Sequence, residues 1–255
     1  MKVIELKTLK ESAASLGFEL AGVAPVEPLG GGWFAPHAAR FEAWIEEGQH
    51  ASMDYIAKRA AERVAPELLL PGVRSALVLW MNHRPPSVRK PSGVRGRIAA
   101  YARGRDYHNV LRKKLRKLQR TLFEECPGMK TYISVDTGAI LERAFAERAG
   151  VGWIGRSTML IHPRLGTFGS IAVLFTDHVF TASDSPHPFR CGTCVACIDA
   201  CPTNALHDGV LDARLCISYW TIEHRGVIPR EIRPLLGDWV FGCDICQDVC
   251  PWNRK

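Results

Sequence analysis

The stretch "CGTCVACIDACPTNAL" (residues 191–206) and the ending "CDICQDVCPWNRK" (residues 243–255) hold seven of the nine cysteines of this chain. In the first stretch the cysteines are separated by two, two and three residues, and a proline follows the last one. In this C-x2-C-x2-C-x3-C-P spacing, three thiolates on one tight loop bind one iron–sulfur cluster and the fourth cysteine ligates another. The second stretch repeats the pattern with one cysteine fewer, so the sequence predicts two 4Fe–4S clusters in the last quarter of the chain.

Eight cysteines can supply both clusters without a remainder. Cys216, which stands alone between the two stretches, replaces the cysteine that the second stretch lacks. Cluster one is predicted to take Cys191, Cys194, Cys197 and the distant Cys250. Cluster two is predicted to take Cys243, Cys246, Cys216 and the crossed-over Cys201. The ninth cysteine, Cys126, is expected to be a structural thiol.

Two other interpretations of the cysteines stay open. Structural zinc usually takes four ligands as two separated pairs, whereas one short run here already supplies four thiols. A disulfide cage is the second alternative, although a disulfide framework is not expected in a reducing compartment.

The bulk composition is that of an ordinary globular chain. The 255 residues are 47% hydrophobic and 23% charged, and the length suits one large domain or a medium domain with a small one. The N-terminus lacks the uncharged apolar block of a signal peptide, and no run approaches the ~20 apolar residues of a membrane helix. We therefore expect a cytoplasmic protein that does not enter a membrane. The net charge of +7 is compatible with a polyanionic partner.

Helical and strand patterns interleave over the first 180 residues and then give way to short cysteine-punctuated segments. Helices are predicted over residues 2–16, 37–50, 53–64, 105–125 and 137–150. Strands are predicted over residues 18–26, 75–82, 130–136, 157–163 and 168–177, the last two joined as a hairpin by "RLGT". A glycine-rich loop (28–36) and a basic loop (84–97) lie between them. The predicted fold is α+β: a mixed-sheet catalytic domain (1–180) and a ferredoxin-like double-cluster domain (181–255).

Several further motifs accompany the cysteines: "MDYIAKR" (53–59), "YARGRDYH" (101–108), "VDTGAILERAFAERAGVGWIGRSTMLI" (135–161) and the ending "CPWN". With these motifs the chain resembles the epoxyqueuosine reductases over nearly its whole length. That family consists of cobalamin-dependent iron–sulfur enzymes that act in the last step of queuosine synthesis in tRNA. Many members carry a helical-repeat extension after the second cysteine block, whereas the sequence here ends at Lys255, so we expect the catalytic parts with a smaller tRNA-binding surface.

The resemblance implies a cobalamin bound between the two domains, with one cluster facing the corrin. No D-x-H-x-x-G type motif is present, so composition and spacing do not themselves indicate this cofactor. The family's proton donor falls on Asp136 in "VDTG". An aspartic acid in water has a pKa of ~3.9, so a donor at neutral pH needs a dry pocket. The alternative role for Asp136 is that of a helix N-cap.

Other residues in the family segments are candidates for contact with cobalamin or substrate. They are Arg59, Tyr101, Tyr107, His108, Thr158 and Asp244. Thr158 is expected on a strand under the corrin. For Tyr107 and His108 the alternative is a helix start with a packed tyrosine and a surface histidine.

The implied partners are the tRNA anticodon loop that carries epoxyqueuosine and an unidentified low-potential electron donor, and we expect a monomer. The basic helix "LRKKLRKLQR" (111–120) is either a solvated face or a set of phosphate contacts. Two other functions stay open: a ferredoxin-type electron carrier, which would bind no corrin, and a corrinoid reductase of a small molecule, which would bind no tRNA.

Overall fold

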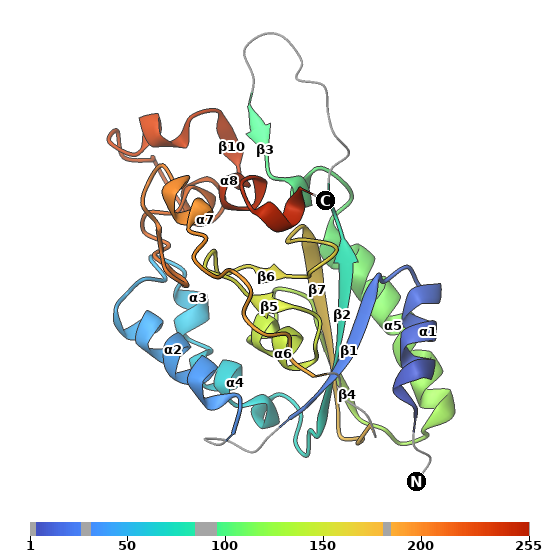
Figure 1. Ribbon diagram of the computed structural model, residues 1–255. Helices are drawn as coiled ribbons and strands as arrows, with labels where there is room; N and C mark the ends of the chain where they lie inside the picture. The colour runs from blue at the N-terminus through green and yellow to red at the C-terminus, as the bar shows by residue number, and fades with distance from the viewer. Residues whose placement is uncertain (1–3, 27–31, 85–95, 181–184, 255) are drawn as a thin grey trace.

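A four-stranded antiparallel sheet forms the centre of the N-terminal part of the chain (Figure 1). The computed structural model describes residues 4–26, 32–84, 96–180 and 185–254, so residues 28–31 of the glycine-rich loop and most of the basic loop lie outside the described residues. The strands, in spatial order, are β1 (Leu20–Pro25), β2 (Ser75–Asn82), β7 (Gly169–Thr176) and β4 (Thr131–Ser134). The α+β class is confirmed, and all three pairings in this sheet are antiparallel.

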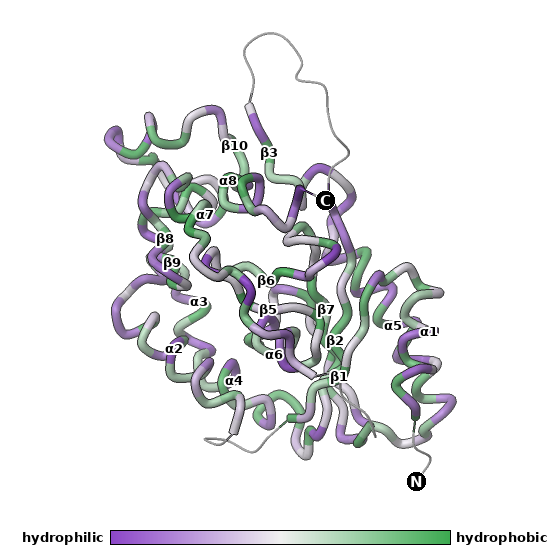
Figure 2. Tube along the Cα trace, in the orientation of Figure 1, coloured by the Kyte–Doolittle hydropathy of each residue, from purple (hydrophilic) through white to green (hydrophobic). Residues whose placement is uncertain are grey.

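Two helices cover one face of the sheet, α1 (Leu6–Ser15) and α5 (Tyr107–Glu125) (Figures 1 and 2). A stripe of leucines on α5 is fully buried and packs on the inward side chains of β2 and β7. It consists of Leu111, Leu115, Leu118 and Leu122. Because these leucines recur every three or four residues, a single helical face delivers them all to the sheet, while the basic side chains point away.

The opposite face of the sheet carries α6 (Glu142–Arg148) and the two-stranded pair of β5 (Trp153–Ile154) and β6 (Leu160–Ile161). Phe145 of α6 packs edge-on against Phe175 of β7 at 5.0 Å between ring centroids. Three short helices lie outside this layer: α2 (Ala35–Glu46), α3 (Asp54–Ala57) and α4 (Ala60–Val64). The sheet is thus buried on both faces, as in a three-layer domain.

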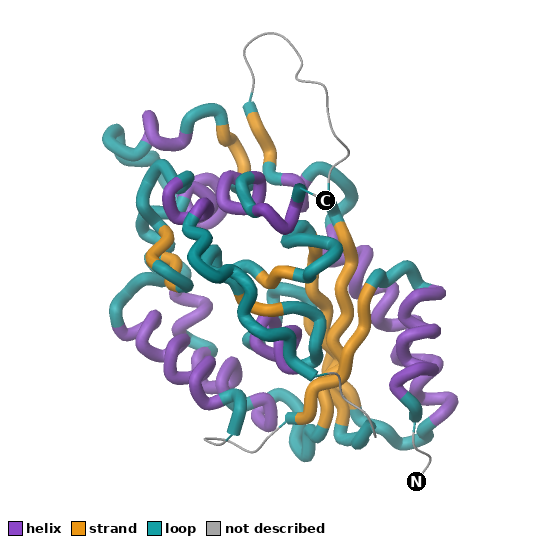
Figure 3. Tube along the Cα trace, in the orientation of Figure 1, coloured by secondary structure: helices purple, strands orange, loops and turns teal. Residues whose placement is uncertain are grey.

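The last quarter of the chain is built mainly from loops and single helical turns (Figure 3). Its elements are α7 (Ala196–Asp199), β8 (Leu206–His207), β9 (Val210–Leu211), a π-helix (Tyr219–Glu223), β10 (Trp239–Phe241) and α8 (Ile245–Asp248). Strand β10 pairs in parallel with β3 (Arg97–Ile98), which belongs to the front half of the sequence. None of the helices among the described residues combines the length and apolar character needed to cross a bilayer.

A buried polar network joins the two parts of the chain. Thr167 donates its backbone N–H to Asn253 Oδ1 (2.8 Å) and its hydroxyl to Gln247 Oε1 (3.0 Å). Asn253 Nδ2 in turn donates to the backbone carbonyl of Gln247 (2.7 Å). All three side chains are buried, so these hydrogen bonds form away from water. A donor or acceptor left without a partner there would destabilise the fold, because it could not bond to water instead.

Three local predictions are wrong. The hairpin expected between residues 157–163 and 168–177 does not form, because β6 pairs with β5 while β7 pairs with β2 and β4. A tight turn containing Thr158 in the left-handed region (φ 62°) reverses the chain there, so Thr158 lies in a turn and not on a strand. The helix expected over 137–150 begins only at Glu142.

The α5 stripe leads to a stability prediction. Leu115→Ala should lower the free energy of unfolding by roughly 2–5 kcal/mol, because it leaves a cavity at a fully buried position. Urea denaturation followed by circular dichroism measures this change, with the exposed neighbour Lys117→Ala as the control. A loss of less than about 1 kcal/mol for Leu115→Ala would contradict this packing.

Candidate functional site

Asp136 lies in the loop between β4 and α6, in the left-handed region of backbone space (φ 59°). Glu142 holds this loop: its Oε1 accepts from the Asp136 backbone N–H (2.8 Å) and from the Ser134 hydroxyl (3.0 Å). The N-cap interpretation of Asp136 is wrong, because α6 begins at Glu142 with Leu141 as its N-cap residue. The Asp136 side chain is 60% exposed, so the described residues do not enclose it in the dry pocket that we expected.

His108, at the start of α5, joins Asp136 to a second carboxylate. Its Nε2 lies 3.1 Å from Asp136 Oδ2, and its Nδ1 lies 2.8 Å from Asp106 Oδ1. Asp106 also caps α5 by accepting from the His108 backbone N–H (2.9 Å). The sequence "RDYH" therefore places a carboxylate, an imidazole and the loop carboxylate in one hydrogen-bonded row.

Two tyrosines from the same segment stand beside this row. The rings of Tyr101 and Tyr107 meet edge to face at 5.7 Å between centroids. Burial, followed by the negative charge of Asp136, raises the pKa of Tyr101 to about 12 and raises that of Tyr107 further. Both phenols therefore stay protonated at neutral pH and can donate hydrogen bonds.

Tyr101 also reaches the cysteine-rich part of the chain. Its ring lies 6.3 Å from that of Phe241 in β10, and the charge of Asp244 contributes to its raised pKa. The Asp244 side chain is buried and accepts from the backbone N–H of Ala100 (2.7 Å). Because Asp244 directly follows Cys243, this contact links the second cysteine stretch to the surroundings of Asp136.

Three residues near Asp136 were not among the sequence candidates. Tyr55 and Glu223 interact with each other, and the charges of Glu223 and Asp136 help to raise the pKa of Tyr55, after burial. Arg63 donates to the backbone carbonyl of Gly138 in the Asp136 loop (3.2 Å). Glu223 ends the π-helix, and such helices are frequent at functional sites, although no sequence pattern indicated one here.

Two other predicted contacts are paired with charged neighbours. Arg59 pairs with Glu62 (3.1 Å) at the surface. Thr158 accepts from Arg143 through its backbone carbonyl in the β5–β6 turn.

The cysteines of the first predicted set line one cavity. A cavity of about 220 Å³ is lined by Cys191, Cys194, Cys197 and Cys250 together with Trp252 and other residues. The second set consists of Cys201, Cys216, Cys243 and Cys246. Within it, burial and the neighbouring thiols of Cys216 and Cys201 raise the pKa of Cys243 to about 12. All nine cysteines are free thiols.

The donor set fits a cluster better than a single ion. Among the described residues, no three Cys, His, Asp or Glu side chains converge closely enough to hold one metal ion. Four thiols spaced around a cavity instead suit a group with several iron atoms, since each thiolate then ligates a different corner.

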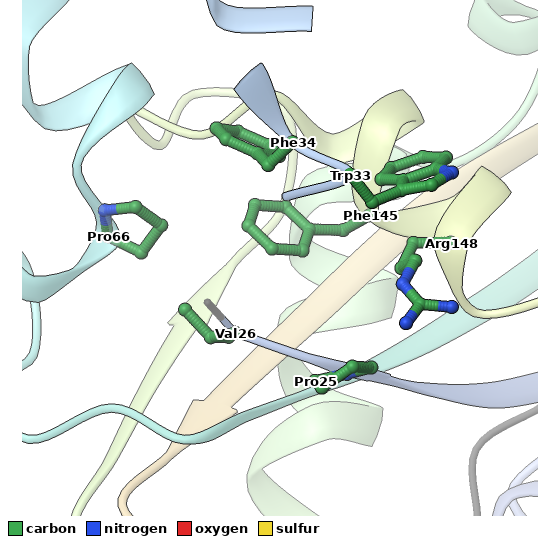
Figure 4. A pocket seen from close by; sticks show the side chains of 7 residues that line it. All are labelled: Pro25, Val26, Trp33, Phe34, Pro66, Phe145 and Arg148. Atoms are coloured by element: carbon green, nitrogen blue, oxygen red, sulfur yellow. The ribbon is translucent and has the colours of Figure 1, made fainter. Parts of the chain in front are cut away.

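A second cavity lies at the far end of the sheet, away from the cysteines (Figure 4). Trp33, Phe34, Phe145 and Arg148 surround it, with Pro25, Val26 and Pro66. Its volume is about 10 Å³, which is room for roughly one water molecule, so it is a packing defect and not a ligand site.

Comparison with known proteins agrees with this arrangement. Residues 63–137 match the family described as "Epoxyqueuosine reductase QueG, DUF1730", and residues 190–253 match a 4Fe-4S double cluster binding domain. The chain is 40% identical to epoxyqueuosine reductases of Aliivibrio fischeri and Pseudomonas aeruginosa, over 97% of its own length. This chain belongs to the epoxyqueuosine reductase family. It spans about two thirds of those relatives, 66% and 68% respectively.

Solved structures of the family share the fold. A crystal structure of epoxyqueuosine reductase with an epoxyqueuosine-modified tRNA stem loop matches 97% of this chain and 65% of that one, with a TM-score of 0.87 and 32% identity. The Bacillus subtilis enzyme matches the same shares with a TM-score of 0.85 and 31% identity, and is described with its aspartate-bearing catalytic loop swung out of the active site. A reductive dehalogenase shares the fold at 16% identity and a TM-score of 0.61, over 98% of this chain and 32% of its own.

The carboxylate that holds the Asp136 loop leads to a pH prediction. Burial and the Asp136 charge raise the pKa of Glu142 from 4.5 to about 7, so the folded protein binds its proton more tightly than the unfolded chain does. Stability from this group is therefore complete below pH 4.5 and is lost as the pH rises to about 7. In Glu142→Gln this part of the pH dependence of stability should vanish. Between pH 4.5 and about 7 the free energy of unfolding of the variant should therefore rise relative to that of the wild type.

Denaturant unfolding of both proteins at pH 5 and pH 8 measures the effect. Glu124→Gln, an exposed carboxylate at the far end of α5, serves as the control. Equal stability differences between wild type and Glu142→Gln at the two pH values would show that Glu142 titrates normally.

Proposed function

We propose that this chain reduces epoxyqueuosine in tRNA to queuosine, with electrons from two 4Fe–4S clusters and a proton from Asp136. The observation that carries the proposal is the position of Tyr101. Its ring meets that of Tyr107, which neighbours His108 and Asp136, and that of Phe241 in β10 (6.3 Å between centroids). The backbone N–H of Ala100, directly before Tyr101, donates to Asp244, next to Cys243 (2.7 Å). A proton donor and an electron source thus share one site, which a reductase needs and a simple electron carrier does not.

The ligand assignment follows from how the thiols group. We assign Cys191, Cys194, Cys197 and Cys250 to cluster one, because they line a common cavity. We assign Cys201, Cys216, Cys243 and Cys246 to cluster two, whose thiols interact with one another. Cys246 also feels the charge of Cys197 of the first set, so the two clusters would lie close enough for electrons to pass between them.

Cobalamin is part of the proposal. When bound, it supplies the two-electron chemistry at the epoxide that single-electron clusters cannot perform alone. The rings of Tyr101 and Tyr107 meet beside Asp136, and the ring of Phe241 meets that of Tyr101. Tyr55, which Asp136 also influences, and Phe241 are 53% and 38% exposed. Such partly exposed aromatic surface, edged by hydrogen-bonding groups, suits a large flat ring with polar side arms.

We propose Tyr101, Tyr107, His108 and Asp244 as the residues that would hold the cofactor. Arg59 and Thr158 stay predictions, since their contacts here are with Glu62 and Arg143. A distant structure with this fold is described as that of an enzyme of B12-dependent dehalogenation, but at 15% identity it supports the fold alone.

The roles of the chain's own residues follow from the reaction's balance. Converting an epoxide to an alkene releases the oxygen as water and consumes two electrons and two protons. Asp136 would deliver a proton from its Oδ to the epoxide oxygen. His108 lies between Asp136 and the exposed Asp106, so it can orient the donor and return a proton to it from solvent.

The tRNA would lie along the basic face of α5. This helix begins at the site, where Arg112 Nη2 donates to Thr137 Oγ1 (2.5 Å) in the Asp136 loop. Its outward face carries exposed cations: Lys113, Arg116, Lys117 and Arg120. Phosphate contacts there would add salt-sensitive affinity while the anticodon loop presents its base to the site. That the chain acts as a monomer stays a prediction.

Cysteine substitution tests the clusters. After anaerobic reconstitution, the wild type should hold about eight iron atoms per chain, two cubanes being the basis of this value. Cys250→Ser should lower the count to about four, because it removes one corner of cluster one. Cys126→Ser, at a buried cysteine outside both sets, should leave the count unchanged. An unchanged count in Cys250→Ser, or a wild type with only one metal atom, contradicts the assignment.

Asp136→Asn tests the chemistry. It should keep iron content and cobalamin binding but lower the turnover of epoxyqueuosine-containing tRNA by about 100-fold or more, the usual contribution of a general acid. Nucleoside digests analysed by mass spectrometry give the turnover, with Glu124→Gln as the exposed-carboxylate control. Normal turnover in Asp136→Asn removes Asp136 from the mechanism, and absence of turnover in the wild type with all cofactors bound refutes the proposed function.

A further inference from the structure

The two sets of cysteines differ in their access to solvent. Among the eight cysteines assigned to clusters, only Cys194 is exposed, and it belongs to the first set. In the second set, Cys243 is followed by Asp244, which accepts from the backbone N–H of Ala100 (2.7 Å), directly before Tyr101. One cluster would therefore face solvent and the other the candidate active site, so electrons would enter at the first.

Exposed apolar side chains flank Cys194 in the sequence. Phe189 is 54% exposed and Val195 is 40% exposed, although both are large hydrophobic residues. Trp252 lines the cavity of the first set beside Cys194. We refer to Phe189, Cys194, Val195 and Trp252 as the Cys194 face. Apolar surface of this kind at the edge of a redox centre is typical of a site that a partner covers.

Arginines border the Cys194 face. Arg190 is exposed and lines the same cavity as Cys194. Arg254 is exposed two residues after Trp252, and Arg84 donates to the backbone carbonyl of Asn253 between them. The acidic Asp208 on this side already pairs with Arg156, whose guanidinium lies 5.8 Å from the Phe189 ring centroid. Three arginines thus lie in or next to the segments of the Cys194 face, which also carry one exposed carboxylate, Asp199.

We propose that the Cys194 face docks an acidic one-electron carrier protein, which delivers electrons to cluster one. This inference rests on the proposed function, because it requires the clusters. In each encounter one electron leaves the carrier, which is oxidised, and enters cluster one, which is reduced by one electron. No bond breaks and no proton moves. A small apolar centre within a charged border fits the weak, electrostatically steered contacts that electron carriers form.

Charge reversal at the border tests the docking site. The probe is plant-type ferredoxin, an acidic 2Fe–2S protein, mixed in reduced form with the reconstituted holoenzyme in a stopped-flow instrument. Arg190→Glu should slow cluster reduction at low salt by about tenfold, and the difference should shrink as salt screens the charges. Lys7→Glu, an equally exposed cation on α1, should react as the wild type does.

Two further measurements separate docking from damage to the cluster. Oxidised ferredoxin should bind Arg190→Glu at least about fivefold more weakly in titration calorimetry. Reduced methyl viologen, a small cation, should reduce the variant no more slowly than the wild type. If Arg190→Glu loses iron, Arg254→Glu, whose side chain does not line the cavity, takes its place in all three measurements.

The outcomes test the docking site separately from the proposed function. If iron content and tRNA turnover with a chemical reductant are normal but ferredoxin binds and reduces both variants as it does the wild type, the docking site is refuted and the proposed function stands. If the wild type binds no clusters, the proposed function fails first. If Arg190→Glu slows cluster reduction by ferredoxin equally at low and high salt, the proposal is also overturned, because the effect of the substitution would not be electrostatic.

Discussion

Burial of thiols is the constraint on which the cysteine-rich part of the molecule depends. Burial raises the pKa of cysteines in both sets, Cys197 and Cys250 in one and Cys216, Cys243 and Cys246 in the other. A thiolate at such a position needs a compensating positive charge, which iron would supply. Iron can compensate these thiolates only if two distant segments of the chain are held against each other. The buried amide network of Thr167, Gln247 and Asn253 does this with neutral hydrogen bonds.

The same convergence assembles the surroundings of Asp136. Tyr101 and Tyr107 come from the front half of the sequence, whereas Phe241, Asp244 and Glu223 come from the cysteine-rich part. Neither half makes the site alone. Because binding of a structural metal group is coupled to folding of its ligand loops, loading of the clusters and completion of the site would be linked.

Patterns with a local cause were predictable from the sequence. The leucine spacing of α5 and the apolar run of β2 led to the right elements, because the 3.6-residue period and the continuous apolar run each suit one structure. The hairpin was wrong because β5 and β6 have two residues each, too few to show a period. The grouping of the cysteines could be expected from spacing, although their role as ligands stays a prediction.

Long-range contacts were not predictable. Tyr55 of α3 and Glu223 of the π-helix are far apart in sequence and meet only in the folded chain. The start of α6 was placed too early for a similar reason. Its first turn depends on the side chain of Glu142 reaching back to Ser134 and to the Asp136 backbone, and no local propensity indicates such a contact.

The left-handed backbone of Asp136 restricts which substitutions evolution can sample at that position. Most side chains are strained at a φ of 59°, whereas asparagine and aspartate tolerate it and glycine adopts it freely. A change to glutamate would keep the acid but pay in backbone geometry, and a change to asparagine would keep the geometry but abandon the acid. With the proposed role of Asp136 as proton donor, chemistry and conformation would select the same residue independently, and this would leave little room for neutral drift.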